Sequence, residues 1–433
     1  MEFPDADTVD DVLPPVAYPE FVDVSYDPPT PEVDDPAAAA REAVADLPLD
    51  SLPGGATVAV GLGSRGITDV VPVATAVVDE LRDRGFDPVA VPAMGSHGGA
   101  TSEGQRRTLA ALGLDEGTLG CPIDVRMGTE VVGETPAGDP VHVALPAVEA
   151  DGVLVVNRVK AHTNFRGPFE SGLTKMTAVG LGKQAGASVI HDRALVDGYV
   201  ESLGATFEVA RESVPLLGGV AVVENFHDDT AEVAGLAADA LPDAETALLD
   251  RAYEYTPTLP FDDLDALVVD EIGKDVSGTG MDTNVIGRYS ALNMDDPERP
   301  DVDRIVVCGL TEATHGNGHG IGLADVTTAA VATELDLDQM YANALTSGSL
   351  SKSALPVVLP DDERALRAAL SAAGPYDPET VRVAWIRDTG HLSSFRVSPA
   401  LAEDLPEHVE AVGRSRLTFA DGNMRFEPVS DDR

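Results

Sequence analysis

The stretch TVAVGLGSRG at residues 57–66 joins a continuous apolar run to a glycine-rich loop. A helical pattern, VVPVATAVVDELRDRG, follows it at residues 70–85. Similar apolar runs recur along the chain as PVAVPAM (88–94), DGVLVVNRV (151–159) and GGVAVVENF (218–226). Strands that are apolar throughout and alternate with helices are typical of parallel sheets covered on both faces. The first half of the chain is therefore predicted to form a mostly parallel α/β sheet.

A second series of apolar runs begins after residue 262. Its predicted strands are ALVVDEIG (266–273), RIVVCGL (304–310), ALPVVLP (354–360) and VRVAWIRD (381–388), and DGNM (421–424) is predicted as a hairpin turn. The fold class that follows is α/β, with two domains whose sheets are mostly parallel. Two such domains in series predict an active site in the cleft between them.

The predicted domain boundaries follow composition. Residues 1–34 are acidic and proline-rich, and we expect an extended N-terminal segment or edge strand there. The predicted N-terminal catalytic domain covers 35–235, a connecting helix and linker covers 236–262, and the C-terminal domain covers 263–433. Within the first domain, Asp35-Pro36 predicts a helix start, and Ser102 with Gln105 predicts a capping box.

The charge of the chain limits its partners. Acidic residues outnumber basic ones 74 to 29, for a formal net charge of −45. Such a surface is typical of adaptation to high salt, so we expect a halophilic protein. Without basic clusters, neither nucleic acid nor an anionic membrane is an expected partner. We expect the protein to lie in a reducing cytoplasm, because its two cysteines are far apart in the sequence. The acidic N-terminus has no apolar signal region, and no apolar run is long enough to span a bilayer.

Lysine is scarce, and the remaining copies are clustered. The 29 basic residues include only five lysines, and three of them (Lys160, Lys175 and Lys183) lie in KAHTNFRGPFESGLTKMTAVGLGK. Arginine can supply charge but not an amine nucleophile. This segment is therefore the first place where we expect covalent chemistry.

Three loops at the ends of predicted parallel strands carry Arg or His. They are GLGSRG with Arg65, AMGSHGG with His97, and NRVKAHTNFRG with His162. Ligands of open parallel sheets bind at this edge, and glycine loops before helices favour anions such as carboxylate or phosphate.

At this point the residues resemble the nickel-dependent lactate racemase family, as a divergent member. The family pairs Thr/Ser with Arg after the first strand and has Gly-Ser/Thr-His after the next. A histidine, a cofactor-bearing lysine and a second histidine sixteen residues beyond that lysine complete the pattern. The matching residues are Ser64, Arg65, His97, His162, Lys175 and His191. Lys183 is a competing candidate for the cofactor lysine, and the spacing favours Lys175.

The resemblance implies a racemase or epimerase of a small 2-hydroxy acid, which is an isomerase. It implies a nickel-pincer nucleotide of the pyridinium-3,5-bisthiocarboxylic acid mononucleotide type, bound to Lys175 and Ser64, with His191 as nickel ligand. His97 and His162 would be the paired acid/base catalysts, and Arg65 would hold the substrate carboxylate. The enzymes that synthesise the cofactor would be transient partners.

The C-terminal half departs from the family pattern. Asp282 and Asn284 are kept as expected substrate-binding residues, but the family's Gln and Lys positions fall on Gly287 and near Ser290. Arg288 is the predicted substitute, and the departure allows a larger or differently charged 2-hydroxy acid than lactate. His315 and His319 have the i, i+4 spacing of a metal pair, but the intervening Gly-Asn-Gly disfavours the helix that such a pair needs.

Two other classes of function stay open. Lys175 is also a candidate Schiff-base lysine of a lyase or aldolase acting on carbonyl substrates. Alternatively, the protein binds a nucleotide or anion without catalysing a reaction.

Overall fold

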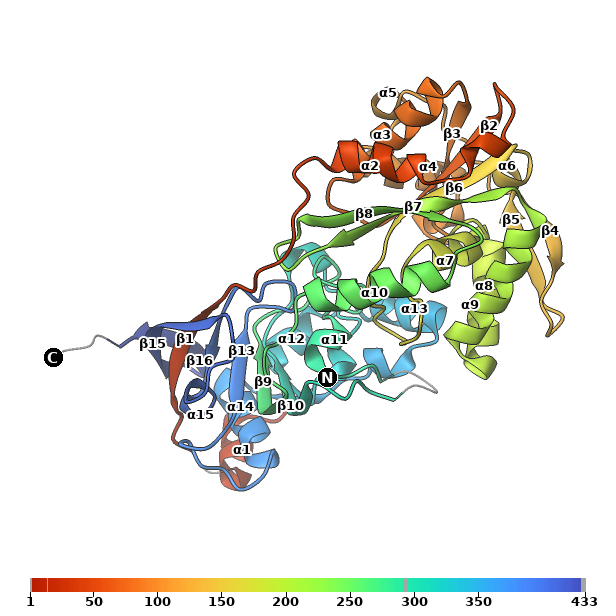
Figure 1. Ribbon diagram of the computed structural model, residues 1–433. Coiled ribbons are helices and arrows are strands. Elements are labelled where there is room, and N and C mark those ends of the chain that lie inside the picture. Colours follow the sequence, from red (N-terminus) through yellow and green to blue (C-terminus); the bar gives the residue numbers. More distant parts are fainter. Residues whose placement is uncertain (1, 14, 291–294, 430–433) are drawn as a thin grey trace. The chain divides into compact units, whose positions relative to one another are not determined.

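The computed structural model describes residues 2–13, 15–290 and 295–429, and the chain divides into two compact units (Figure 1). The inserted unit is Thr30–Thr256, and the discontinuous unit combines Met1–Pro29 with Pro257–Arg433. Both units contain a sheet rich in parallel strands, which confirms the predicted α/β class. In the described part of the chain, no helix is long and apolar enough to cross a bilayer.

The inserted unit is built on a five-stranded sheet with strand order β3-β2-β6-β7-β8. The first four strands are parallel, and β8 pairs antiparallel with β7. The strands of this sheet are β2 (Thr57–Leu62), β3 (Asp87–Pro92), β6 (Gly152–Arg158), β7 (Leu216–Glu224) and β8 (Thr230–Ala237). A separate hairpin consists of β4 (Thr129–Glu134) and β5 (Pro140–Ala144).

Helices cover both faces of this sheet (Figure 1). Val58, Val60 and Leu62 of β2 belong to the core beneath α2 (Pro36–Ala45) and α3 (Val70–Asp83). The opposite face packs tightly on the later helices, since a Cβ on Gly219 would lie 3.0 Å from Leu173 Cδ1. The remaining helices are η1 (Leu49–Ser51), η2 (Gly98–Ala100), α4 (Ser102–Ala111), α5 (Glu116–Leu119), α6 (Leu145–Val148), α7 (Leu173–Lys175), η3 (Met176–Gly180, a π-helical turn), α8 (Lys183–Asp197), α9 (Tyr199–Ser213) and α10 (Asp243–Tyr255).

One predicted helix start is confirmed and the other is wrong. Asp35 caps α2 by accepting a 2.9 Å hydrogen bond from the Ala38 amide. The cap of α4 is Thr101, whose Oγ1 accepts from the Gly104 amide, rather than Ser102. Gln105 takes no part in a capping box, because its buried side chain donates to the Gly95 carbonyl.

The discontinuous unit is built on a nine-stranded mixed sheet with order β12-β11-β10-β9-β13-β14-β1-β15-β16. The run from β12 to β13 is parallel, and the pairs from β13–β14 onward are antiparallel. The strands are β1 (Glu20–Tyr26), β9 (Asp263–Val269), β10 (Asp301–Val307), β11 (Val326–Thr328), β12 (Val357–Leu359), β13 (Val383–Ile386), β14 (Ser394–Val397), β15 (Val409–Ala420) and β16 (Asn423–Pro428).

The core of this unit centres on Trp385 of β13. Its ring makes edge contacts with Phe21 and Phe426, at centroid distances of 5.8 and 4.8 Å. The hairpin predicted at 421–424 is confirmed, since Asp421 and Gly422 both have positive φ between β15 and β16. The helices are α1 (Ala6–Val12), α11 (Thr283–Ile286), η4 (Glu312–Thr314), η5 (Ile321–Leu323), α12 (Ala329–Glu334), α13 (Leu337–Ser347), η6 (Leu350–Ser353), α14 (Asp362–Ala372) and α15 (Pro399–Ala402).

Two segments differ from their predictions. Within 1–34, α1 is helical, and β1 lies between β14 and β15 inside the sheet rather than at its edge. Within 236–262, helix α10 belongs to the inserted unit rather than to a linker. In both cases long-range packing decides the structure, which a segment's own composition does not reveal.

Candidate active site

Two of the predicted loops meet beyond β2 and β3. These strands are parallel neighbours that pair Leu62 with Pro92, so the loops after them emerge at the same edge. The Ser64 hydroxyl and His97 Nδ1 lie 2.5 Å apart, which joins the two loops directly. The sequence prediction that these loops share one edge of the sheet is therefore confirmed.

The Arg65 guanidinium lies in the same loop as Ser64. Desolvation, and then the charge of Arg158, lower the pKa of Arg65, but an arginine keeps its charge at neutral pH. Arg158 is ion-paired with Glu224, whereas the described residues offer Arg65 no such carboxylate. In a chain with 74 acidic residues, an arginine that lacks an ion pair beside a second arginine is suited to an external anion.

His97 is held in its neutral form. The residue is exposed to solvent, but the surrounding protein atoms still partly desolvate the ring. This desolvation lowers the pKa of His97 to about 4. The positive charges of Arg65, Lys175 and His191 act in the same direction. An imidazole in this setting is an unprotonated base at neutral pH.

Lys175 occupies the last position of α7. Burial, and next the charge of Arg65, lower the pKa of Lys175 to about 7, while Glu170 acts in the opposite direction. Its Nζ lies 5.9 Å from the centre of the Phe165 ring. A partly neutral amine is a nucleophile, whereas an ordinary lysine at neutral pH is not.

A break in the helical run brings Lys175 and His191 within electrostatic reach. Sixteen residues of straight α-helix would separate them by about 24 Å. Instead, the π-helical turn η3 follows Lys175, and Lys183 begins α8 with a φ of 52°. The charge of Lys175 contributes to lowering the pKa of His191, after desolvation. The break in the helical run, rather than the sixteen-residue spacing itself, thus brings the two charges close enough to interact.

The loop that carries His162 is fixed by a buried carboxylate. Glu170 accepts hydrogen bonds from the His162 and Gly167 amides, at 2.5 and 3.1 Å. His162 Nδ1 accepts from the Asn164 amide at 3.1 Å. A neutral imidazole whose Nδ1 accepts a hydrogen bond carries its proton on Nε2.

Aromatic rings connect the two later histidines. Phe165 and Tyr199 are stacked, with centroids 5.0 Å apart and planes 13° apart. His162 lies against Phe165 at 4.4 Å, and the Tyr199 hydroxyl lies 3.1 Å from His191 Nδ1. The predicted residues of the inserted unit therefore form one connected cluster: Ser64, Arg65, His97, His162, Lys175 and His191.

Sequence reasoning missed the support that α10 gives this cluster. Glu245 Oε2 accepts hydrogen bonds from the Thr174 amide and hydroxyl, at 2.8 and 3.0 Å, directly before Lys175. The Tyr253 hydroxyl donates to Glu170 at 2.7 Å. The signal was present, because the buried residues Glu245, Leu248, Leu249 and Ala252 of α10 have helical spacing.

Lys183 has a structural role. The side chain is fully buried, and its Nζ donates to the Pro92 carbonyl at 2.6 Å and to Gln105 Oε1 at 2.9 Å. Burial lowers the pKa of Lys183 to about 8. These contacts hold α8 to the end of β3 and favour Lys175 as the reactive amine.

The three substrate-binding residues predicted in the discontinuous unit are held by local contacts. Asp282 caps α11 by accepting from the Asn284 amide, and Asn284 Oδ1 accepts from Tyr289 at 2.7 Å. Arg288 donates to the carbonyls of Leu323, Val302 and Asp303 and pairs with Asp325 at 2.7 Å. The contacts of Arg288 are structural, which the sequence did not predict. A role of these residues toward substrate stays a prediction.

The metal pair suggested by His315 and His319 does not form a helical site. The chain from 315 to 320 is non-helical, as the glycines predicted. His319 is buried, and its Nδ1 lies 2.8 Å from Ser353 Oγ. Desolvation, with Lys274 and Lys352, lowers the pKa of His319 to about 4. Among the residues that the structure describes, no group of three or more His, Cys, Asp or Glu side chains could hold a metal ion.

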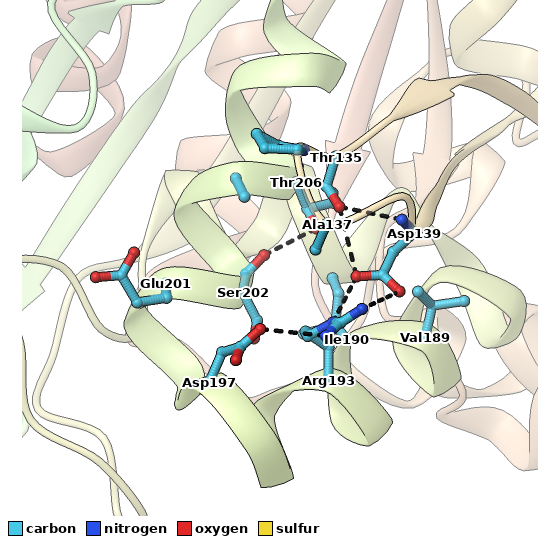
Figure 2. Close-up of a pocket in the computed structure, with 12 residues that line it drawn as sticks. Thr135, Ala137, Asp139, Val189, Ile190, Arg193, Asp197, Glu201, Ser202 and Thr206 are labelled. Atoms are coloured by element: carbon cyan, nitrogen blue, oxygen red, sulfur yellow. Dashed lines mark hydrogen bonds and ion pairs between the residues drawn. The ribbon is translucent and has the colours of Figure 1, made fainter.

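A cavity of about 410 Å³ lies between the loop of the β4–β5 hairpin and helices α8 and α9 (Figure 2). Arg193 on its wall pairs with Asp139 at 2.6 Å, and its neighbours include Val189, Ile190 and Ser202. None of the predicted site residues lines this cavity. We therefore treat it as separate from the candidate active site.

Comparison with known proteins gives a likeness of fold. No protein-family model matches the chain, and no curated protein matches it. Among solved structures, it is similar to the lactate racemase apoprotein from Thermoanaerobacterium thermosaccharolyticum, with a TM-score of 0.49 and 13% sequence identity. The match covers 85% of this chain and 88% of that one. At this level the likeness assigns no function.

The reactivity of Lys175 can be measured on the isolated protein. With a limiting amine-acylating reagent at pH 7, we expect Lys175 to react first among the five lysines, with a midpoint near its pKa of about 7. An ordinary lysine with a pKa of about 10.4 is less than about 0.1% neutral at that pH. Peptide mass spectrometry across a pH series gives the rate at each lysine. If the acylation rate of Lys175 reached its midpoint only above pH 9, this would contradict a desolvated Lys175 amine beside Arg65.

Proposed function

We propose that the protein is an isomerase, a racemase or epimerase of 2-hydroxy acids that uses a nickel-pincer nucleotide attached to Lys175. The observation that supports this most directly is the cluster in the inserted unit. His97 is within electrostatic reach of Arg65, Lys175 and His191, and all four were expected from sequence pattern alone. The proposal makes this cluster the catalytic half of the enzyme.

The residues present fit such a cofactor chemically. A lysine with a pKa of about 7 supplies the neutral amine that a thioamide link requires. His191 is a neutral imidazole, because desolvation lowers its pKa, and imidazole is a suitable nickel ligand. A nucleotide that brings its own sulfur ligands needs few donors from the protein. When bound, the nucleotide supplies hydride acceptance, which no amino-acid side chain provides.

The chain's own residues would bind the substrate and move its proton. Arg65 would hold the carboxylate and so fix the orientation of C2. His97, unprotonated at neutral pH, would accept the hydroxyl proton of one enantiomer through its ring nitrogen, and in the reverse direction it would give that proton back to the same oxygen. His162 would serve the hydroxyl of the other enantiomer from its own loop.

The two histidines are not equivalent in their hydrogen bonds. His97 Nδ1 faces a serine hydroxyl, which can either donate or accept. His162 Nδ1 faces the Asn164 backbone N–H, which can only donate, so His162 would accept the substrate proton at Nδ1 only by giving up this hydrogen bond. We therefore expect isomerisation in both directions. Substituting His97 and substituting His162 should lower the rates of the two directions unequally.

The test is the fate of the C2 hydrogen. Protein co-expressed with the cofactor-synthesis enzymes would be incubated in D₂O with single enantiomers of several 2-hydroxy acids, followed by chiral chromatography and mass spectrometry. Hydride return within the site keeps the original hydrogen, so we expect inverted product without deuterium at C2. Complete deuteration at C2 would indicate proton abstraction and contradict the proposal. A similarly loaded His97→Gln variant is the control for enzyme-catalysed inversion.

A second candidate function draws on the same low pKa of Lys175. A neutral, partly exposed amine is also what a Schiff-base lyase or aldolase requires. Borohydride would then trap a carbonyl substrate on Lys175 in protein without nickel. No adduct is expected under the leading proposal.

We propose that the protein works in a cytoplasm of high salt concentration. The cofactor-synthesis enzymes would be its transient partners, and its substrate would be a small 2-hydroxy acid. The charge of −45 supports this setting, because salt screens the self-repulsion of such a surface. The same charge argues against nucleic acid and anionic membranes as partners.

A further inference from the structure

We infer that Tyr199 is a positioning residue that sets the tautomer and orientation of His191. The Tyr199 hydroxyl lies 3.1 Å from His191 Nδ1, and the two rings meet nearly edge to face, with planes 83° apart. This inference rests on the proposed function, in which His191 is the nickel ligand. It concerns the nitrogen that would be offered to the metal.

The argument begins with how the chain brings Tyr199 to His191. Helix α8 ends at Asp197 and is followed by its C-cap residue Gly198, whose φ of +85° is readily adopted by glycine. Tyr199 then opens α9, which packs against α8. The tyrosine thus lies beside a histidine eight residues earlier, on a separate helix.

Stacking fixes the position of the tyrosine ring. Its partner Phe165 is fully buried, with centroids 5.0 Å apart and planes 13° apart. The Phe165 ring also packs against the ring of His162, with centroids 4.4 Å apart. The hydroxyl is therefore held in place by a packed column of rings, and that column extends to the loop of the proposed second base.

The chemistry of imidazole then gives the hydroxyl its role. A neutral imidazole binds a metal through the nitrogen that carries no proton. A tyrosine hydroxyl can donate or accept, and we assign the Tyr199 oxygen as the acceptor of Nδ1–H. In that arrangement Nε2 keeps its lone pair and points away from the tyrosine. Partners of this kind orient metal-binding histidines, and their loss commonly weakens metal binding by about 10- to 100-fold.

The test compares Tyr199→Phe with wild type, and Tyr341→Phe, at an exposed tyrosine of α13, is the matched control. The phenylalanine ring keeps the stack and removes only the hydroxyl. In cofactor-free protein, ¹⁵N NMR of the imidazole should show His191 as the Nδ1–H tautomer in wild type and as a tautomer mixture in Tyr199→Phe. In loaded protein dialysed against a chelator, the time for which nickel stays bound should fall by about 10- to 100-fold in Tyr199→Phe and stay unchanged in Tyr341→Phe.

The outcomes separate the inference from the proposed function. Wild-type His191 in the Nε2–H tautomer would overturn the inference, as would unchanged nickel retention in loaded Tyr199→Phe. Wild-type protein that never takes up nickel would sink the proposed function, and the tautomer measurement would still decide the role of Tyr199.

Discussion

A Lys175→Arg variant should lose racemisation by at least about 10⁴-fold, the scale seen when a covalent catalytic group is removed. Arginine preserves the positive charge but cannot form the amide-like link to the cofactor. The expected result is a folded protein whose intact mass stays unmodified after co-expression with the cofactor-synthesis enzymes. Turnover of a 2-hydroxy acid and intact mass, measured on the same preparation, test this.

Two other lysines in the same segment supply the matched controls. Lys160→Arg should keep both adduct and activity, because arginine preserves the charge at this position and the backbone bridge to Ser171 does not depend on the side chain. Lys183→Arg should lower the melting temperature, since the buried amine bonds to Pro92 and Gln105, but an adduct should still form on Lys175. An adduct that persists in Lys175→Arg and disappears in Lys183→Arg would transfer the cofactor site to Lys183.

A Glu245→Ala substitution should destabilise the inserted unit by about 2–4 kcal/mol, from a lost buried side chain and unsatisfied donors. Glu245 is fully buried and accepts both the amide and the hydroxyl of Thr174. Its loss should also loosen α7, so cofactor loading on Lys175 should fall even below the unfolding temperature. Urea denaturation and intact mass after co-expression give the two readouts.

The matched variant is Glu245→Gln, which tests a pH effect. Burial raises the pKa of Glu245 from 4.5 to about 7, and hydrogen bonds from Thr174 oppose that rise only partly. The folded state therefore favours the protonated acid. Stabilisation is fully present below pH 4.5 and is lost as pH rises through about 7, by up to about 3 kcal/mol.

Glu245→Gln should remove this part of the pH dependence, because an amide does not titrate in this range. Unfolding free energies of wild type and Glu245→Gln should converge near pH 4.5 and differ most above pH 7, with the variant then the more stable. Parallel curves from pH 4.5 to 8 would contradict a titrating Glu245.

The sequence predicted the parallel strands well because they are buried on both faces. Runs such as TVAVGL and RIVVCGL need no neighbour to be recognised, and both became central strands. Strand β15 was not predicted, because it is largely exposed and rich in polar residues, with five consecutive exposed positions after Val409. Its pairing with β1 depends on chain segments nearly 400 residues apart.

The candidate site was predicted where the sequence resembles a known family. The resemblance singled out the interval from Lys175 to His191, and the fold brings these two side chains within electrostatic reach, although a straight helix would have kept them apart. The supporting carboxylates were not predictable in the same way. Glu170 and Glu245 are buried acids, and each has a partner remote in sequence, Tyr253 for Glu170 and Thr174 for Glu245. A charged residue in a polar segment usually faces solvent.

The central claim is that Lys175 carries a nickel-pincer nucleotide. The most direct measurement is the intact mass, peptide mapping and metal content of protein co-expressed with the complete set of cofactor-synthesis enzymes. The account predicts one covalent adduct, located on Lys175, with nickel bound in proportion to it. An unmodified Lys175 in that preparation, while a lactate racemase expressed beside it becomes loaded, would contradict the account.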